Sequence, residues 1–205
     1  MLTVNGDRDV VERQLGSGEL SCPLCGGVLG GWGSGVTRPV RQADGPDEEV
    51  TPRRSRCRSC RATHVLLPAR LLSRRADAGA VIGRALEAKA AGAGHRAIAG
   101  LLGRPESTVR GWLRALARNA GAVRERFTSL AASLAADPPL PAPAGSPLAD
   151  AVAAVAAAAA AAVLLPGVGK VARWELASAV TCGLLLAPSW PAAAGNASWL
   201  WAAAR

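Results

Sequence analysis

The chain has 205 residues, half of them hydrophobic, and a formal net charge of +9 at pH 7. This length can hold one domain or a few small ones, and the hydrophobic content is enough to bury a core. The first 15 residues carry three acidic side chains and no apolar stretch, so no signal peptide is recognisable. We therefore expect a cytoplasmic protein.

Two Cys-x-x-Cys pairs are the first motif along the chain. Paired thiolates at this spacing give Zn²⁺ its tetrahedral four-sulfur site. The pattern therefore predicts one structural zinc ion, with the ligands Cys22, Cys25, Cys57 and Cys60. Two disulfides are the alternative interpretation, but disulfides need an oxidising compartment.

The residues around these cysteines predict a zinc ribbon over residues 22–76, preceded by an N-terminal segment, residues 1–21. Short β-prone runs between glycines and turn residues predict its strands. The predicted strands are residues 28–32, 36–41 and 63–67. His64 falls in the last strand, and we interpret it as a strand residue because four thiolates already complete a zinc site.

The excess positive charge lies in the first two thirds of the chain. Residues 1–75 carry 12 basic and 8 acidic side chains, residues 76–136 carry 9 and 4, and residues 137–205 carry 3 and 3. An arginine-rich stripe without acidic residues runs from residue 50 to residue 76 and predicts contact with a phosphate backbone. A solvated basic surface without a partner is the alternative. The ribbon arginines that we assign to DNA are Arg53, Arg54, Arg56, Arg58 and Arg61.

A three-helix unit is predicted next, over residues 77–136. Asp77 can cap its first helix, which ends near Gly92. Residues 95–114 then fit a helix-turn-helix, because Gly103 stands at the turn, where a positive φ is needed. The second helix would present a polar face to the major groove of DNA. That face consists of Ser107, Thr108, Arg110, Gly111 and Arg114. A helical hairpin that serves only as core is the alternative.

Together, residues 22 to about 120 resemble the zinc-ribbon plus helix-turn-helix N-terminal module of bacterial insertion-sequence transposases and of related uncharacterised actinobacterial-type helix-turn-helix proteins. The resemblance rests on the two cysteine pairs and on the runs 56–68 and 103–113. It implies that the ribbon and the helix-turn-helix both grip the terminal repeats of the mobile element. By the same resemblance the four cysteines are metal ligands and residues 106–117 are the reading helix.

The sequence departs from the transposases downstream of this module. A transposase continues into a domain with three metal-binding carboxylates. After residue 126 this chain holds only three acidic residues, in alanine-rich sequence without convincing strands. They are Asp137, Asp150 and Glu175. We therefore expect the protein not to be an enzyme.

Apolar residues continue from Val109 to Leu134 at alternating spacings of four and three residues. This heptad pattern fits a coiled-coil homodimer, which would suit inverted DNA half-sites. It fits equally a helix that packs on the C-terminal part of its own chain. The sequence leaves both interpretations open.

A proline-rich linker is predicted at residues 137–147 and an alanine-rich helical domain at residues 148–205. Ser146 followed by Pro147 is a typical helix start. The two predicted helices of this domain span residues 148–165 and 171–187.

The apolar run in this domain, residues 151–165, is shorter than the roughly 20 residues that span a bilayer. We therefore expect a buried helical hairpin rather than a membrane anchor. Cys182 lies in a second apolar run and is expected to be a small buried side chain.

The sequence thus predicts a mainly α protein with a small β zinc ribbon, a three-helix helix-turn-helix domain and an alanine-rich C-terminal helical domain. We expect it to bind double-stranded DNA sequence-specifically, as a transcriptional regulator or an accessory protein in transposition. Zn²⁺ is the expected cofactor, and no small-molecule substrate is identified. A degenerate transposase or recombinase and a membrane-tethered DNA-binding regulator are the alternatives.

Overall fold

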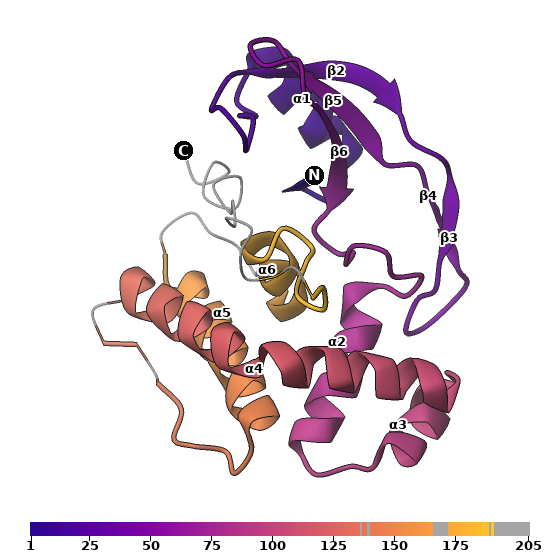
Figure 1. Cartoon of the computed structure of the whole chain (residues 1–205), viewed down its shortest axis with the longest axis vertical. Coiled ribbons are helices and arrows are strands. Elements are labelled where there is room, and N and C mark those ends of the chain that lie inside the picture. Colours follow the sequence, from indigo (N-terminus) through magenta and orange to yellow (C-terminus); the bar gives the residue numbers. More distant parts are fainter. Residues whose placement is uncertain (136, 139, 166–171, 189, 191–205) are drawn as a thin grey trace.

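A four-stranded sheet with the strand order β1-β6-β5-β2 forms the N-terminal end of the molecule (Figure 1). The computed structural model describes residues 1–135, 137–138, 140–165, 172–188 and 190. The strands are β1 (Leu2–Val4), β2 (Leu29–Ser34), β5 (Arg53–Cys57) and β6 (Thr63–Pro68). The sheet is mixed, because β1 runs parallel to β6 whereas the other pairs are antiparallel.

Helix α1 (Arg8–Ser17) packs on one face of this sheet. Its first turn is capped by Asp7, whose side chain accepts a hydrogen bond from the backbone N–H of Asp9. Apolar side chains of the helix and of the strands share a small core, in which Leu15 contacts the cluster that contains Leu29 and Leu66. The N-terminal segment is therefore an integral part of the sheet domain.

A two-stranded ribbon connects the sheet with the helical part of the molecule (Figure 1). It consists of β3 (Arg38–Val40) and β4 (Glu48–Val50), which pair antiparallel. Val40 and Val50 are buried and belong to the same core cluster as the helices. The ribbon is thereby fixed to the helices by packing.

The helical part contains five helices along the described chain. They are α2 (Gly79–Ala90), α3 (His95–Leu102), α4 (Glu106–Leu134), α5 (Pro147–Val163) and α6 (Arg173–Val180). Ser146 caps α5 as expected, because its hydroxyl accepts a hydrogen bond from the N–H of Ala149. The expected cap of α2 is wrong: Ala78 occupies the cap position, and the carboxylate of the buried Asp77 instead pairs with Arg104 and Arg41.

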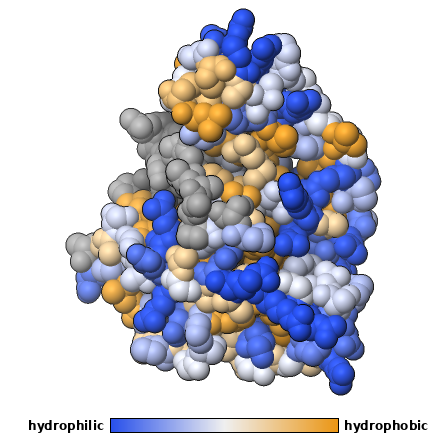
Figure 2. Space-filling view, viewed as in Figure 1, coloured by the Kyte–Doolittle hydropathy of each residue, from blue (hydrophilic) through white to orange (hydrophobic). Residues whose placement is uncertain are grey.

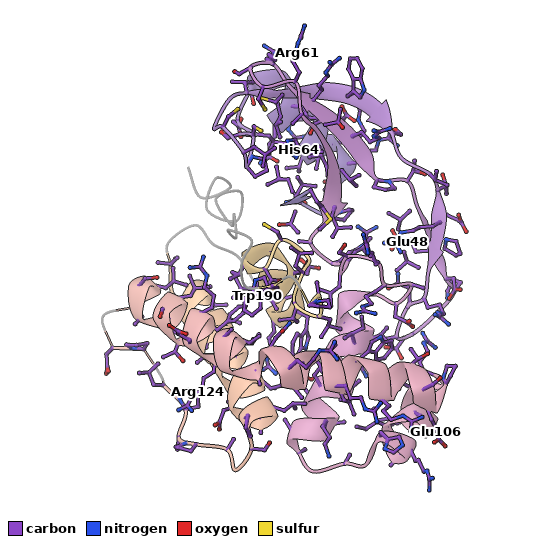
Figure 3. All side chains as sticks on the ribbon, viewed as in Figure 1. Glu48, Arg61, His64, Glu106, Arg124 and Trp190 are labelled. Carbon is purple, nitrogen blue, oxygen red and sulfur yellow. The ribbon has the colours of Figure 1, made fainter. Side chains whose placement is uncertain are left out.

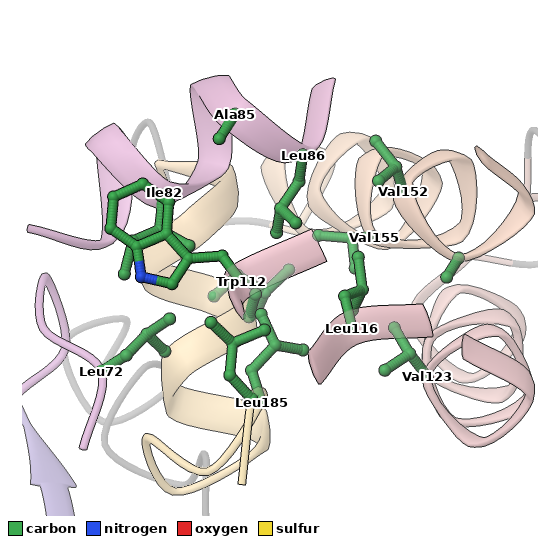
Figure 4. Close-up of a cluster of buried hydrophobic side chains, with 14 of the residues drawn as sticks. Leu72, Ile82, Ala85, Leu86, Trp112, Leu116, Val123, Val152, Val155 and Leu185 are labelled. Atoms are coloured by element: carbon green, nitrogen blue, oxygen red, sulfur yellow. The ribbon is translucent and has the colours of Figure 1, made fainter. Parts of the chain in front are cut away.

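One apolar core joins these helices (Figure 4). Leu86 of α2, Leu116 of α4 and Val155 of α5 are each no more than 1% exposed and belong to this core. Alanines such as Ala158, with no exposed surface, keep α5 thin enough to lie close to α4. The alanine-rich composition of α5 therefore serves close helix packing.

The expected mainly α fold class is wrong. The described structure is 46% helical and 18% strand, with six helices and a mixed four-stranded sheet. Two features of the sheet cause the difference. The segment before the first cysteine supplies the strand β1, and the arginine-rich residues 53–57 form β5, a central strand.

The heptad stripe is used within the chain. Val123 and Phe127 have no exposed surface, and they belong to the core cluster that α5 shares with α4. Of the two interpretations left open by the sequence, the structure matches the helix that packs on its own C-terminal part. Dimerisation through this stripe would require separating α4 from α5.

The C-terminal part differs in extent from the predicted helices. The second helix, α6, ends at Val180 and is followed by turns rather than by helix to residue 187. Residues 166–171 and 191–205 of the predicted domain lie outside the described residues. Among the described helices, none is long and apolar enough to cross a membrane.

Candidate functional site

Cys22, Cys25, Cys57 and Cys60 converge on one point at the end of the sheet. Their four Sγ atoms all lie within 4.8 Å of one another. The Sγ–Sγ distance is 3.7 Å for Cys22 and Cys60 and 3.5 Å for Cys25 and Cys57. A tetrahedral zinc site with Zn–S bonds of about 2.3 Å has sulfurs about 3.8 Å apart, whereas a disulfide requires about 2.0 Å. The predicted ligand cluster is confirmed as a group that can hold a metal ion.

Backbone hydrogen bonds form each cysteine pair into a tight turn. In the first turn, the N–H of Gly26 donates to the carbonyl of Cys22, and the N–H of Cys22 donates to that of Gly27. A Cβ on Gly27 would lie 2.5 Å from Ser59 Oγ and 3.1 Å from Cys57 Sγ. Only glycine at this position lets the two turns approach closely enough for their sulfurs to meet.

The polypeptide prepares Cys57 for ionisation. Burial opposes the charged form, but backbone N–H groups of Cys60 and Ser59 and the neighbouring thiols outweigh it and lower the pKa of Cys57 to about 6. For Cys60, the N–H of Ala62 favours the thiolate, yet the nearby Cys25 and Cys57 sulfurs and burial raise its pKa to about 12. Four sulfurs this close cannot all carry charge alone, so a cation is needed to hold them as thiolates.

His64 lies beside the cluster, on β6 as expected. It is buried, and its Nε2 atom lies 3.3 Å from Cys22 Sγ. A ring N–H on Nε2 would therefore donate to the sulfur, as residues behind metal ligands often do. The sequence could not reveal this contact, because it depends on the register between β6 and the first cysteine turn.

The second candidate site is the beginning of α4. Gly103 has φ 60° and ends α3, as the helix-turn-helix pattern predicts, and α4 begins at Glu106. The predicted DNA-reading residues divide by exposure. Ser107, Arg110, Gly111 and Arg114 are exposed and Thr108 is half-buried. Val109 and Trp112, on the opposite side of the helix, are buried in the core.

Ion pairs fix the turn before α4. Arg104 donates from Nε to the Asp77 carboxylate at 2.5 Å and from a terminal nitrogen to the carbonyl of Gln42 at 3.0 Å. It thereby ties the turn to α2 and to the β3–β4 ribbon. Glu106 pairs with Arg96 across the same turn. The charged groups of Arg104 and Glu106 are thus engaged in ion pairs within the protein. Arg110 and Arg114 remain as exposed arginines on this face of α4.

The five arginines between residues 53 and 61 that the sequence assigns to DNA do not share one environment. Arg53 donates to both carboxylate oxygens of Glu12 on α1 and to the carbonyl of Gly33. Arg53 is therefore held inside the domain. Arg54 and Arg56 are half-buried on β5, and Arg58 and Arg61 are exposed at the second cysteine turn.

Replacing Glu12 with glutamine tests the internal role of Arg53. The hydrogen bond from Arg53 lowers the pKa of Glu12. A carboxylate with a lowered pKa stabilises the fold above its ordinary pKa, and this contribution is lost as the pH falls through the lowered value. Glu12→Gln should therefore reduce the free energy of unfolding by less than about 1 kcal/mol at neutral pH and by nothing in acid. Urea unfolding at the two pH values measures this, with the exposed Glu49→Gln as control; a difference that grows in acid would contradict it.

The two candidate sites lie at opposite ends of the long axis of the molecule. Figure 3 shows Arg61 at the sheet end and Glu106 at the helical end. Hydrophilic side chains lie at both ends, and at the sheet end they stand beside an apolar patch (Figure 2). A single extended ligand would have to follow the side of the molecule to reach both.

The comparisons with known proteins add one finding. A domain of unknown function (DUF6431) matches residues 22–112. The match begins at the first metal-ligand candidate and ends at Trp112, in the second turn of α4. It therefore covers the cysteine cluster and most of the predicted helix-turn-helix, but not Arg114. No curated protein and no solved structure matches the chain significantly.

Proposed function

We propose that the protein binds double-stranded DNA sequence-specifically, as a transcriptional regulator or an accessory protein in transposition. The observation that carries this proposal is the exposed row Ser107, Arg110, Gly111 and Arg114 directly after the αL turn at Gly103. The opposite side of α4 is anchored in the core, so the row faces outward on a rigid helix. Arginines on such a helix can pair bidentately with guanine in the major groove.

Gly111 supports a close contact between the backbone of α4 and DNA. A Cβ added to it would meet nothing within 4 Å, so no packing constraint requires glycine there. Glycine inside a helix is about 1 kcal/mol less favourable than alanine. A helix surface without a side chain at this point would let the backbone come close to the bases between Arg110 and Arg114.

Zinc is the metal that we assign to the four cysteines. An all-thiolate tetrahedral set is typical of structural zinc. In this proposal the metal fixes the cysteine turns, which carry Arg58 and Arg61, and these arginines contact phosphates. We assign no catalytic role to the acidic residues downstream: Asp150 is engaged by Arg124 and by the N–H of Ala144.

Two sets of arginine variants test the division between base reading and phosphate binding. Arg110→Ala or Arg114→Ala should weaken binding to the preferred site by about 1–3 kcal/mol and relax the base preference at one position. Arg58→Ala should weaken all sequences alike and reduce the salt dependence by about one counterion. Titrations of preferred and scrambled duplexes at several salt concentrations measure both effects.

The control for these variants is Arg53→Ala. Arg53 is paired with Glu12, so its loss should leave the salt dependence of DNA binding unchanged. If the helix variants and Arg58→Ala change all duplexes to the same extent, α4 does not read bases and the proposal is wrong.

A further inference from the structure

The face of the sheet opposite α1 has a different chemistry from the face that α1 covers. Side chains alternate across a strand, and Ser55 and Cys57 of β5 point to the covered side, where both are fully buried. Arg54 and Arg56 consequently lie on the open side. Arg58 joins them, because a Cβ on Gly30 of the neighbouring β2 would lie 3.6 Å from its Nε. Three arginines therefore line one open sheet face.

The charged side chains that the strands contribute to this open face are all basic. The strands β2, β5 and β6 contain no acidic residue. Glu12, which pairs with Arg53, belongs to α1 on the other face. The charge of the open face is therefore not neutralised by the strands that build it and is complementary to a polyanion.

An aromatic ring stands among these arginines. Trp32 of β2 is 50% exposed, and the guanidinium carbon of Arg56 lies 4.6 Å from the centre of its ring. Arg56 is held in this position by donating to the carbonyl of Arg61 at 3.2 Å. A cation–π contact at an exposed site contributes only about 0.5–1 kcal/mol, which is a weak reason to leave half of a tryptophan in water.

The three arginines and the exposed tryptophan together limit which kind of anionic ligand fits this face. The carboxylates of an acidic peptide or the backbone of a duplex would satisfy the arginines, but neither offers a flat surface to the exposed part of the Trp32 ring, since the bases of a duplex are already stacked on one another. Unpaired nucleotides offer both a phosphate and a free base for each position. We propose that the open face of the sheet, formed by Trp32, Arg54, Arg56 and Arg58, binds single-stranded nucleic acid. A base stacks on the Trp32–Arg56 pair, and the phosphates lie along the other two arginines.

This inference rests on the proposed function in taking DNA as the ligand, but it uses a different surface from α4. The protein would hold the duplex on α4 and at the cysteine turn that carries Arg58 and Arg61, and it would hold an unpaired segment on the sheet face next to Arg58. Such a ligand is a duplex whose strands are separated near the bound site.

Fluorescence anisotropy with the full chain tests the proposal. The probes are a labelled single strand of about 12 nucleotides and a hairpin duplex of the same sequence. Trp32→Ala should weaken single-strand binding by about 5- to 150-fold, the range expected for one stacked base, and leave duplex binding within twofold. Trp32→Phe should retain most of the affinity. Arg56→Lys keeps the charge but loses the planar group, so it should lose affinity while keeping the salt dependence.

Two controls separate this proposal from the one for α4. Val36→Ala removes another exposed apolar side chain, 86% exposed, and should change nothing. Arg110→Ala should weaken the duplex and leave the single strand unaffected; if it leaves duplex binding intact, the role of α4 fails while that of the sheet stands. Wild-type single-strand affinity in Trp32→Ala, or an equal loss for both probes, would overturn the single-strand site.

Discussion

Replacing Cys57 with serine is expected to release the metal and to unfold the sheet around it. Cys57 has no exposed surface and belongs both to the sulfur cluster and to the small core under α1. A serine hydroxyl does not replace a thiolate ligand of zinc. Binding of structural zinc contributes on the order of 10 kcal/mol, comparable to the whole stability of a domain. Metal analysis and hydrogen exchange of β5 and β6 measure the two losses.

The matched control is Cys182→Ser. Cys182 is also buried, with 5% of its surface exposed, but it follows α6 and lies outside the sulfur cluster. This variant should keep about one metal ion per chain. Acidification should also release the metal from the wild type, because each ligand must lose its proton to bind. A sheet that keeps its protection without metal would show that the cluster is not structural.

The second large effect is expected for Phe127→Ala. Phe127 has no exposed surface and packs in the core shared by α4 and α5. Removing a buried phenyl group leaves a cavity and should lower the free energy of unfolding by about 3–5 kcal/mol. Since α5 belongs to the same chain, the loss should not depend on protein concentration. Urea unfolding at two concentrations tests this.

Leu101→Ala is the control for the cavity. Leu101 is 65% exposed on α3, so its truncation should change stability by less than about 0.5 kcal/mol. A Phe127→Ala effect that increases on dilution would mean that a second chain covers the stripe. The coiled-coil homodimer would then replace the packing of α4 on α5.

Local signals in the sequence located most of the helices and the metal ligands. The cysteine spacing needs only two short turns, and Gly103 and the apolar spacing around it specify α3 and the start of α4. The parallel pairing of Leu2 with Leu66 joins residues far apart in the chain, and a three-residue strand has no recognisable period. The sequence therefore predicts too few strands, and for this reason the predicted fold class is wrong.

The heptad stripe illustrates a different limit. A 4-3 spacing specifies which face of a helix is apolar, but an identical face can pack on another chain or on α5. The same limit applies to the surface arginines. Arg53 and Arg54 are neighbours in an arginine-rich run, yet strand alternation sends one to Glu12 and the other to the open face. The position of α1 then decides which of the two faces is covered.

Selection of bound duplexes from a random pool tests the central claim most directly. The wild-type protein should enrich a defined sequence that contains guanines. The same selection with Arg110→Ala should lose the preference at one position while it keeps the remainder of the site. No enrichment by the wild type, or an identical site with Arg110→Ala and Arg114→Ala, would contradict the assignment of α4 as the DNA-reading helix.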